Sequence, residues 1–168
     1  MAGPLYHYFL DDHRRLEALL NRAAADPEKI DEAAYEAFRQ GLLTHIGAEE
    51  KILFPAAQSA HGGPLPMAAK LRLDHGALAA LLVPPPSARI IAAIRAILAD
   101  HDRIEESPGG LYDQCETLLG GEVDALMDRI RSAPALRAIP HNDDPNVLEV
   151  VRRILERAGY NFDDYAGT

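Results

Sequence analysis

The sequence predicts an all-α chain that folds as an up-down-up-down antiparallel four-helix bundle with an additional C-terminal helix. Alanine, leucine, arginine and glutamate dominate the composition, and β-branched and aromatic residues are sparse. Apolar residues recur at intervals of three and four, and no stretch alternates with a period of two. Proline and glycine clusters divide the chain into four principal segments with short connections, which is the pattern of an antiparallel bundle.

Helix breakers and caps mark the ends of each predicted helix. Pro4 opens the first helix, "DPEK" separates the first two, and Pro55 is expected in the last turn of the second. "PPPS" precedes the fourth helix, for which Ser87 is a suitable cap. "SPGG" at 107–110 ends that helix, and "GG" at 120–121 weakens the middle of the next piece. The predicted segments are 4–25, 31–57, 66–82, 87–106, 111–131 and 146–158.

The domain organisation follows from these breaks. The 168 residues suit one domain with an appendage. Residues 1–132 are predicted to form the bundle, and residues 133–168 a Pro-rich linker, a short amphipathic helix and a mobile tail. The apolar stripe of that helix is expected to pack on the bundle or on a partner protein, and it consists of Val147, Val151, Ile154, Leu155 and Ala158.

Charge and composition exclude several functions. A net charge of −9 with only 17 Lys and Arg argues against nucleic acid and anionic membranes as partners. Cys115 is the only cysteine, which excludes an internal disulfide and a four-cysteine metal site. The start of the chain does not resemble a signal peptide, and no apolar run approaches the ~18 residues that span a bilayer. These features predict a soluble cytoplasmic protein without a phosphate-binding loop or a Gly-x-Ser-x-Gly motif.

Polar residues interrupt the apolar row of each long helix. Each row contains one histidine, and the second and fourth rows add a glutamate one turn later. A single histidine in such a row is usually a hydrogen-bonded core residue, but the same substitution in four helices points to a shared site. The six candidate ligands are His13, His45, Glu49, His75, His101 and Glu105.

Two glutamates in a bundle core need a compensating cation. A buried carboxylate without partners is costly, and the apolar rows contain no lysine or arginine. A metal ion meets this need, and a mixed set of imidazoles and carboxylates suits iron or manganese. Glu50 and Glu106 are second choices as ligands, whereas His7, His61 and His141 fall outside the rows. The alternative is a metal-free helical interaction module, which leaves six polar core residues unexplained.

Four segments carry a resemblance to a known family. They are "DDHRRLEALL", "HIGAEEKILFP", "LRLDHGALAALL" and "HDRIEESPGGLY", and over about residues 5–130 they resemble a hemerythrin-like (HHE cation-binding) domain. The resemblance implies that the six candidate residues hold two iron ions in an oxo- or hydroxo-bridged non-haem di-iron centre, with Glu49 and Glu105 bridging the ions. Manganese and zinc are alternative ions. The ferritin-like alternative requires Glu-x-x-His pairs, and none of the four histidines has a glutamate three residues before it.

Two departures from the family pattern bear on function. Oxygen-carrying hemerythrins have a further histidine where this chain has Leu71, so one iron would lose a nitrogen ligand. The "SPGG" break leaves open whether Glu105 or Glu106 faces the metals. The resemblance implies a carrier, store or sensor that binds O2 or a related small molecule such as NO or peroxide. The alternative is a di-iron enzyme that turns over peroxide or NO, or oxidises iron, because a missing ligand leaves an open coordination position.

Overall fold

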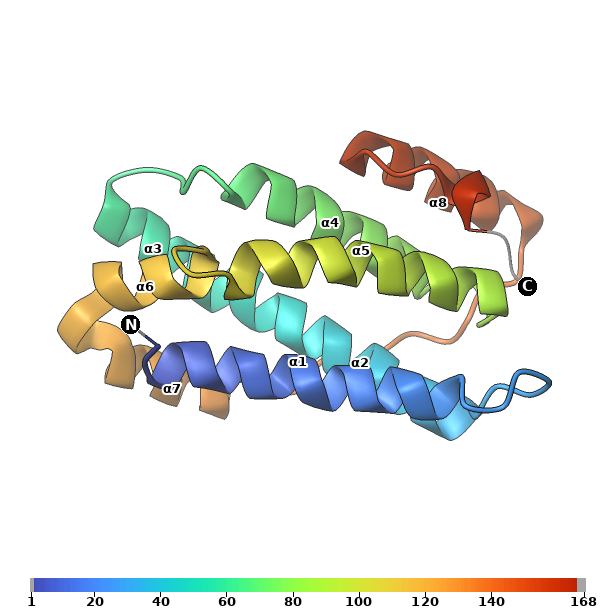
Figure 1. Cartoon of the computed structure of the whole chain (residues 1–168), viewed down its shortest axis with the longest axis horizontal. Helices are drawn as coiled ribbons and strands as arrows, with labels where there is room; N and C mark the ends of the chain where they lie inside the picture. Colours follow the sequence, from blue (N-terminus) through green and yellow to red (C-terminus); the bar gives the residue numbers. More distant parts are fainter. Residues whose placement is uncertain (1, 166–168) are drawn as a thin grey trace.

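The computed structural model describes residues 2–165, and in this range every regular element is a helix (Figure 1). The α-helices are α1 (Pro4–Ala23), α2 (Glu32–Ala48), α3 (Phe54–His61), α4 (Ala68–Leu81), α5 (Ala88–Glu106), α6 (Leu111–Leu119), α7 (Val123–Ser132) and α8 (Pro145–Ala158). The predicted fold class is confirmed: the long helices form an up-down-up-down antiparallel bundle, and α8 packs beside α4 (Figure 1).

Side-chain caps fix the starts of three helices. Asp31 accepts a hydrogen bond from the Ala34 amide at 3.0 Å, and Asp144 caps the first turn of α8. The Ser87 hydroxyl accepts from the Ile90 amide at 3.2 Å, as predicted. Four predicted segments, the first, third, fourth and last, agree with α1, α4, α5 and α8 to within one turn.

The second predicted helix is longer and less regular than expected. A π-helical turn, Glu49–Leu53, joins α2 to α3, and the helical residues continue to His61. Pro55 therefore lies in the first turn of α3, and the prediction that the helix ends at Ala57 is wrong. Proline has no N–H to offer the preceding turn and its ring crowds that turn. The π turn accommodates it, because the Phe54 amide donates to the Glu49 carbonyl five residues back.

The predicted 111–131 segment is divided in two. Gly120 has a φ of 48°, which favours glycine, and a 3-10 turn at Gly120–Glu122 separates α6 from α7. The two short helices cover the bundle at the end that holds α3 and the start of α1 (Figure 1).

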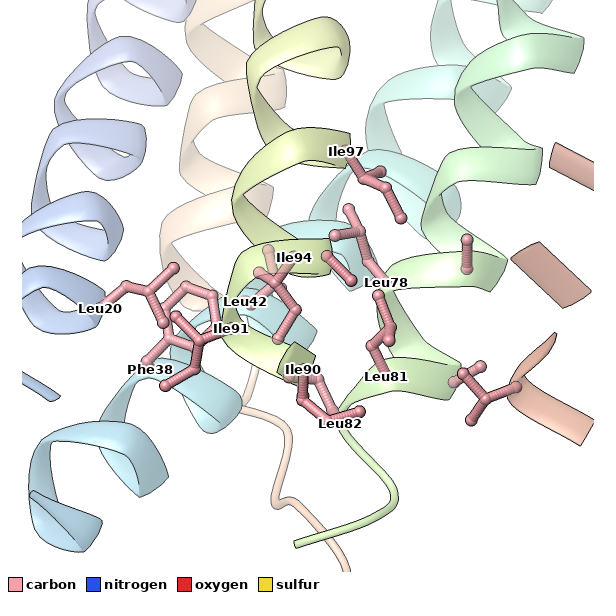
Figure 2. Packing of buried hydrophobic residues seen from close by; sticks show 14 of the residues in the cluster. Leu20, Phe38, Leu42, Leu78, Leu81, Leu82, Ile90, Ile91, Ile94 and Ile97 are labelled. Atoms are coloured by element: carbon pink, nitrogen blue, oxygen red, sulfur yellow. The ribbon is translucent and has the colours of Figure 1, made fainter. Parts of the chain in front are cut away.

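Two apolar clusters fill the bundle, and each occupies one end of it. The first cluster, seen in Figure 2, includes Leu20, Phe38, Leu42, Leu78, Leu81, Ile90, Ile94 and Ile97. The second cluster includes Phe9, Leu53, Leu71, Tyr112 and Met127. The histidines and glutamates of the apolar rows lie in a polar layer between these clusters, which keeps bulk water away from both sides of the layer.

The C-terminal appendage is tied to the bundle along its length. Arg39 is 2% exposed and donates to the carbonyls of Leu82 at 3.0 Å and Ile139 at 2.8 Å, and the Asn142 amide donates to the Val83 carbonyl. The stripe of α8 lies against the bundle, with Leu155 fully buried. Phe162 is also buried, in a part of the predicted tail.

The last three residues of that tail lie outside the described range, and the division of the chain at residue 132 stays a prediction. None of the helices in residues 2–165 has the length and apolar character required to cross a bilayer.

Candidate metal centre

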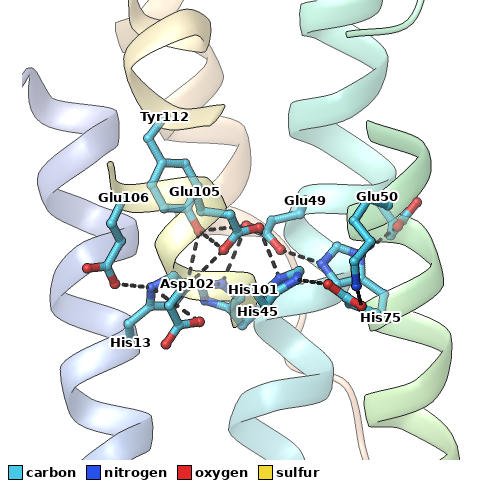
Figure 3. A network of polar contacts seen from close by, with 12 residues as sticks. His13, His45, Glu49, Glu50, His75, His101, Asp102, Glu105, Glu106 and Tyr112 are labelled. Carbon is cyan, nitrogen blue, oxygen red and sulfur yellow. Dashed lines mark hydrogen bonds and ion pairs between the residues drawn. The ribbon is translucent and has the colours of Figure 1, made fainter. Parts of the chain in front are cut away.

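The structure brings all six predicted side chains together in the polar layer (Figure 3). α1, α2, α4 and α5 each supply one imidazole, the π turn supplies Glu49, and α5 also supplies Glu105. Each residue is at most 8% exposed, and both glutamates are fully buried. The helical rows that predicted these residues therefore converge at one level of the bundle.

The donor atoms fall into two groups that share one carboxylate. The first group is formed by Glu49, His75, His101 and Glu105, and its donor atoms all lie within 4.8 Å of one another. The second group consists of His13, His45 and Glu105 at the same limit. A shared carboxylate between two sets of donors is suited to a pair of metal ions.

The inward donor atoms are close together but poorly satisfied by one another. The Nε2 atoms of His13 and His45 are 3.0 Å apart, and one proton at most can lie between them. His75 Nε2 approaches a Glu49 oxygen at 3.1 Å, yet neither atom makes a directed hydrogen bond within the described chain. Unpartnered polar atoms are rare in protein interiors. A cation among them would satisfy these lone pairs, so the residues present fit a metal ion.

The outward nitrogen of every histidine meets a carboxylate. The four Nδ1 contacts are His13 to Glu106 at 2.6 Å, His45 to Asp12 at 2.8 Å, His75 to Glu50 at 2.6 Å, and His101 to Asp74 at 3.4 Å. A ring that donates from Nδ1 presents the Nε2 lone pair to the interior, which is the tautomer a metal requires.

These contacts also distinguish each glutamate of the cluster from the glutamate next to it in the sequence. Glu105 points into the cluster and is fully buried, whereas Glu106 lies on the outer side of His13 (Figure 3). Glu49 and Glu50 flank opposite sides of the His75 ring in the same way. The second-choice residues from the sequence therefore contact the outward faces of the histidines.

Tyr112 is a residue of the cluster that sequence reasoning missed. Its hydroxyl lies 2.7 Å from Glu49 Oε1, 2.9 Å from Glu105 Oε2 and 3.1 Å from His13 Nε2. The side chain comes from α6, beyond the "SPGG" break, so the helical rows gave no reason to place it here. A buried tyrosine needs a partner for its hydroxyl, and that requirement is the available signal.

Sequence reasoning also missed the two aspartates that contact the outward nitrogens of histidines, for a different reason. Asp12 and Asp74 each precede a predicted histidine in the sequence, but each bonds the histidine of another helix, His45 or His101. The Asp-His dipeptide is the signal in the sequence, and only the packing of the helices gives the pairing.

The buried carboxylates change the acid–base properties of the histidines. Burial lowers the pKa of His13, but hydrogen bonds to Glu105 and Glu106 outweigh it and raise the pKa to about 11. In the same way burial opposes, and nearby carboxylates raise, the pKa of His45 to about 9 and that of His101 to about 10.

The glutamates are perturbed in the opposite direction. Burial raises the pKa of Glu49, but the positive charge of His45, and with it that of His75, holds the pKa well below its usual range. The raised histidine pKa values mean that imidazolium charge can compensate the glutamates as well as the metal ion that the sequence predicts. Metal ions and protons compete for the same lone pairs.

A cavity of about 590 Å³ opens beside the cluster. Its walls come from α1, α2, α4 and α5 and include His13, His45, His101, Leu16, Leu42 and Leu98. Arg14 and Arg95 also line it and are exposed. The cavity gives a small molecule a route to the cluster.

Leu71 is fully buried in the second apolar cluster. Its side chain has no donor atom, so the first donor group has two imidazoles rather than three. The group therefore offers two imidazoles and two carboxylates.

Comparison with known families agrees with this geometry. Residues 5–132 match the Hemerythrin HHE cation binding domain, a range that includes the bundle and all six predicted residues. No curated protein and no solved structure gives a significant match. The family and the buried His/Glu cluster together indicate that the protein binds metal ions. The chain therefore belongs to the hemerythrin HHE cation-binding domain family.

Proposed function

We propose that the chain holds two iron ions in a non-haem di-iron centre and binds O2, or a related small molecule such as NO or peroxide, as a carrier, store or sensor. The observation that carries this proposal is the pair of donor groups that share Glu105. Four imidazoles and two carboxylates form a mixed nitrogen and oxygen set that favours iron or manganese over thiolate-bound metals. Bound iron would supply reversible one-electron redox chemistry.

The residues have distinct tasks in this proposal. His13 and His45 would hold one ion, and His75 and His101 would hold the other. Glu105 belongs to both groups, and Glu49 lies 3.5 Å from His45 and 3.1 Å from His75, so both carboxylates would help to hold the metal. The outer carboxylates hold the imidazole rings in their tautomers. The Tyr112 hydroxyl donates a hydrogen bond to one of the two glutamates and so limits the movement of these carboxylates.

The surroundings support a small ligand and controlled access. The two apolar clusters exclude water from both sides of the polar layer. The cavity beside His13 provides a path from the surface. A reducing cytoplasmic compartment would suit the ferrous protein. The proposal also includes a protein partner that binds to the C-terminal helix.

Metal content and an absorption spectrum test the proposal. Anaerobic reconstitution with Fe(II), followed by air, should give about two irons per chain and the absorption bands of a di-ferric centre. Parallel loading with Mn(II) and Zn(II) compares the alternative ions under the same conditions. A colourless protein with a metal content far from two per chain would contradict the proposal.

Two observations favour a second candidate, a di-iron enzyme that turns over peroxide or NO, or oxidises iron. Leu71 supplies no ligand, which leaves an open position, and the 590 Å³ cavity is much larger than a diatomic molecule. Consumption of peroxide, NO or Fe(II) well beyond one equivalent per centre would support the enzyme. A single stoichiometric oxidation would support the carrier or sensor.

A further inference from the structure

The outer partner of His101 differs from the other three. The side chains of Asp12, Glu50 and Glu106 are 20%, 29% and 26% exposed, so water can solvate them. The side chain of Asp74 is fully buried. A buried carboxylate depends on its protein partners for its charge and orientation. Asp74 is therefore the outer partner whose position other parts of the protein can control.

Lys70 is the cation that holds Asp74. It lies one turn earlier on α4, and its ammonium group donates to the carboxylate oxygen that does not face His101. Asp74 is thus shared between a histidine of the cluster and a lysine, one carboxylate oxygen facing each.

The C-terminal segment holds Lys70 in turn. The ammonium group donates to the Tyr160 hydroxyl at 2.9 Å and to the Ala158 carbonyl, at the end of α8, at 3.4 Å. It also lies 4.5 Å from the centre of the Tyr160 ring, within the range of a cation–π contact. α8 packs along α4 (Figure 1), so these contacts lie at the seam between the two helices.

A second cation on α4 shows what is special about this chain of contacts. Arg72 approaches Glu50, the outer partner of His75, at 3.3 Å. The side chain of Arg72 is 44% exposed, and its other contact in residues 2–165 is with the Phe54 ring. Both cations hold an outer carboxylate, but Lys70 also contacts the C-terminal segment.

Metal binding at His101 would affect each contact in the series from His101 through Asp74 and Lys70 to the C-terminal segment. A metal would replace the proton on Nε2 and immobilise the ring, while the proton on Nδ1 stays directed at Asp74. The immobilised ring then positions one oxygen of Asp74, and the other Asp74 oxygen accepts a hydrogen bond from Lys70. Lys70 is thereby held in contact with Tyr160 and the end of α8.

We propose that the C-terminal segment, residues 145–165, acts on the metal centre through Lys70 and Asp74. Docking of α8 strengthens metal binding at His101, and metal binding strengthens the docking of α8 by the same factor, because coupling between two equilibria is reciprocal. Lys70 and Tyr160 are positioning residues in this scheme. The coupling rests on the proposed metal centre but not on the identity of its small-molecule ligand.

Hydrogen exchange of the full-length protein tests the coupling without any variant. The probe is Co(II), which accepts histidine and carboxylate ligands and gives visible absorption bands when bound. Amide exchange in residues 145–165 is compared between the metal-free and Co(II)-loaded protein, because exchange reports local opening. The coupling predicts slower exchange in this segment after loading.

Three variants then assign the route. Lys70→Met should raise the dissociation constant for Co(II) about tenfold, which is the lower end of the effect of losing a residue that orients a metal-binding histidine. The same variant should abolish the exchange response of residues 145–165. Tyr160→Phe should change both quantities in the same direction by less. Arg72→Met is the matched control, since it also frees an outer carboxylate on α4. It should leave the exchange response intact.

The outcomes separate this inference from the proposed function. Tight Co(II) binding with no exchange response in residues 145–165 overturns the coupling and leaves the proposed function standing. A response that survives in Lys70→Met overturns the route through Lys70. A response lost equally in Arg72→Met overturns it as well. A protein that binds no metal ion overturns both the coupling and the proposed function.

Discussion

Glu105→Gln removes one negative charge from the middle of the bundle and preserves the shape of the side chain. In the structure the Glu105 carboxylate lies 3.3 Å from His13 Nε2, 3.1 Å from His101 Nε2 and 2.9 Å from the Tyr112 hydroxyl. It is also the residue that both donor groups share. We therefore expect the variant to lose most of its metal from both groups, whereas a change at a residue of one group would leave the other loaded.

The same substitution should also destabilise the metal-free protein. Burial and the nearby Glu49 raise the pKa of Glu105, but His101 and His13 outweigh them and lower it. A lowered pKa means that the ionised group stabilises the fold at pH 7, and that this contribution is lost as the pH falls through the folded-state pKa. Removing one partner of a buried ion pair costs about 3–5 kcal/mol. Glutamine retains hydrogen bonds, so we expect a loss of about 1–3 kcal/mol.

Glu106→Gln is the matched control, because it changes the adjacent residue in the same way. Glu106 is 26% exposed and contacts the outward nitrogen of His13. We expect both groups to keep their metal in this variant, with affinity at the His13 group lowered about 10- to 100-fold. The measurements are metal per chain by mass spectrometry and urea unfolding of the metal-free proteins. Loss of metal in Glu106→Gln together with retention in Glu105→Gln would refute the reasoning.

Three further predictions follow from contacts described above. The pKa of His13 is raised to about 11, so its contribution to metal-free stability is complete below pH 6.5 and lost as the pH approaches 11; metal affinity should fall towards low pH, with proton release at pH 7 measurable by calorimetry in two buffers. Tyr112→Phe removes the hydroxyl that donates to one of two buried carboxylates and should lower metal-free stability by about 1–3 kcal/mol in urea unfolding. Arg39→Met leaves the Leu82 and Ile139 carbonyls without their donor, so proteolysis of the 133–144 linker should become faster.

Helical periodicity explains why much of the fold was predictable. The rows are local patterns, so His45 and Glu49 could be assigned to one face of one helix without knowledge of the neighbouring helices. Four such faces can be buried together only in a bundle, which brought the candidate residues to one level. The caps at Asp31 and Ser87 are equally local.

The features that escaped prediction depend on contacts between elements. The histidine that Asp74 contacts is His101 rather than the adjacent His75, and only the packing of α4 on α5 determines that choice. Tyr112 reaches the cluster because the chain turns back after "SPGG". The π turn forms because Pro55 disrupts regular α-helical hydrogen bonding while packing keeps the chain helical. The periodicity of apolar residues reports neither effect.

The two apolar clusters have a consequence for how the metal-free protein opens. Each cluster has its own set of buried side chains, and the layer between them contains charges whose mutual attraction depends on pH and on bound cations. Without metal, the protein therefore resembles two short apolar cores separated by a polar layer more than it resembles one continuous core. Its two ends can fluctuate as separate cooperative units, and a cation in the layer would join them into one.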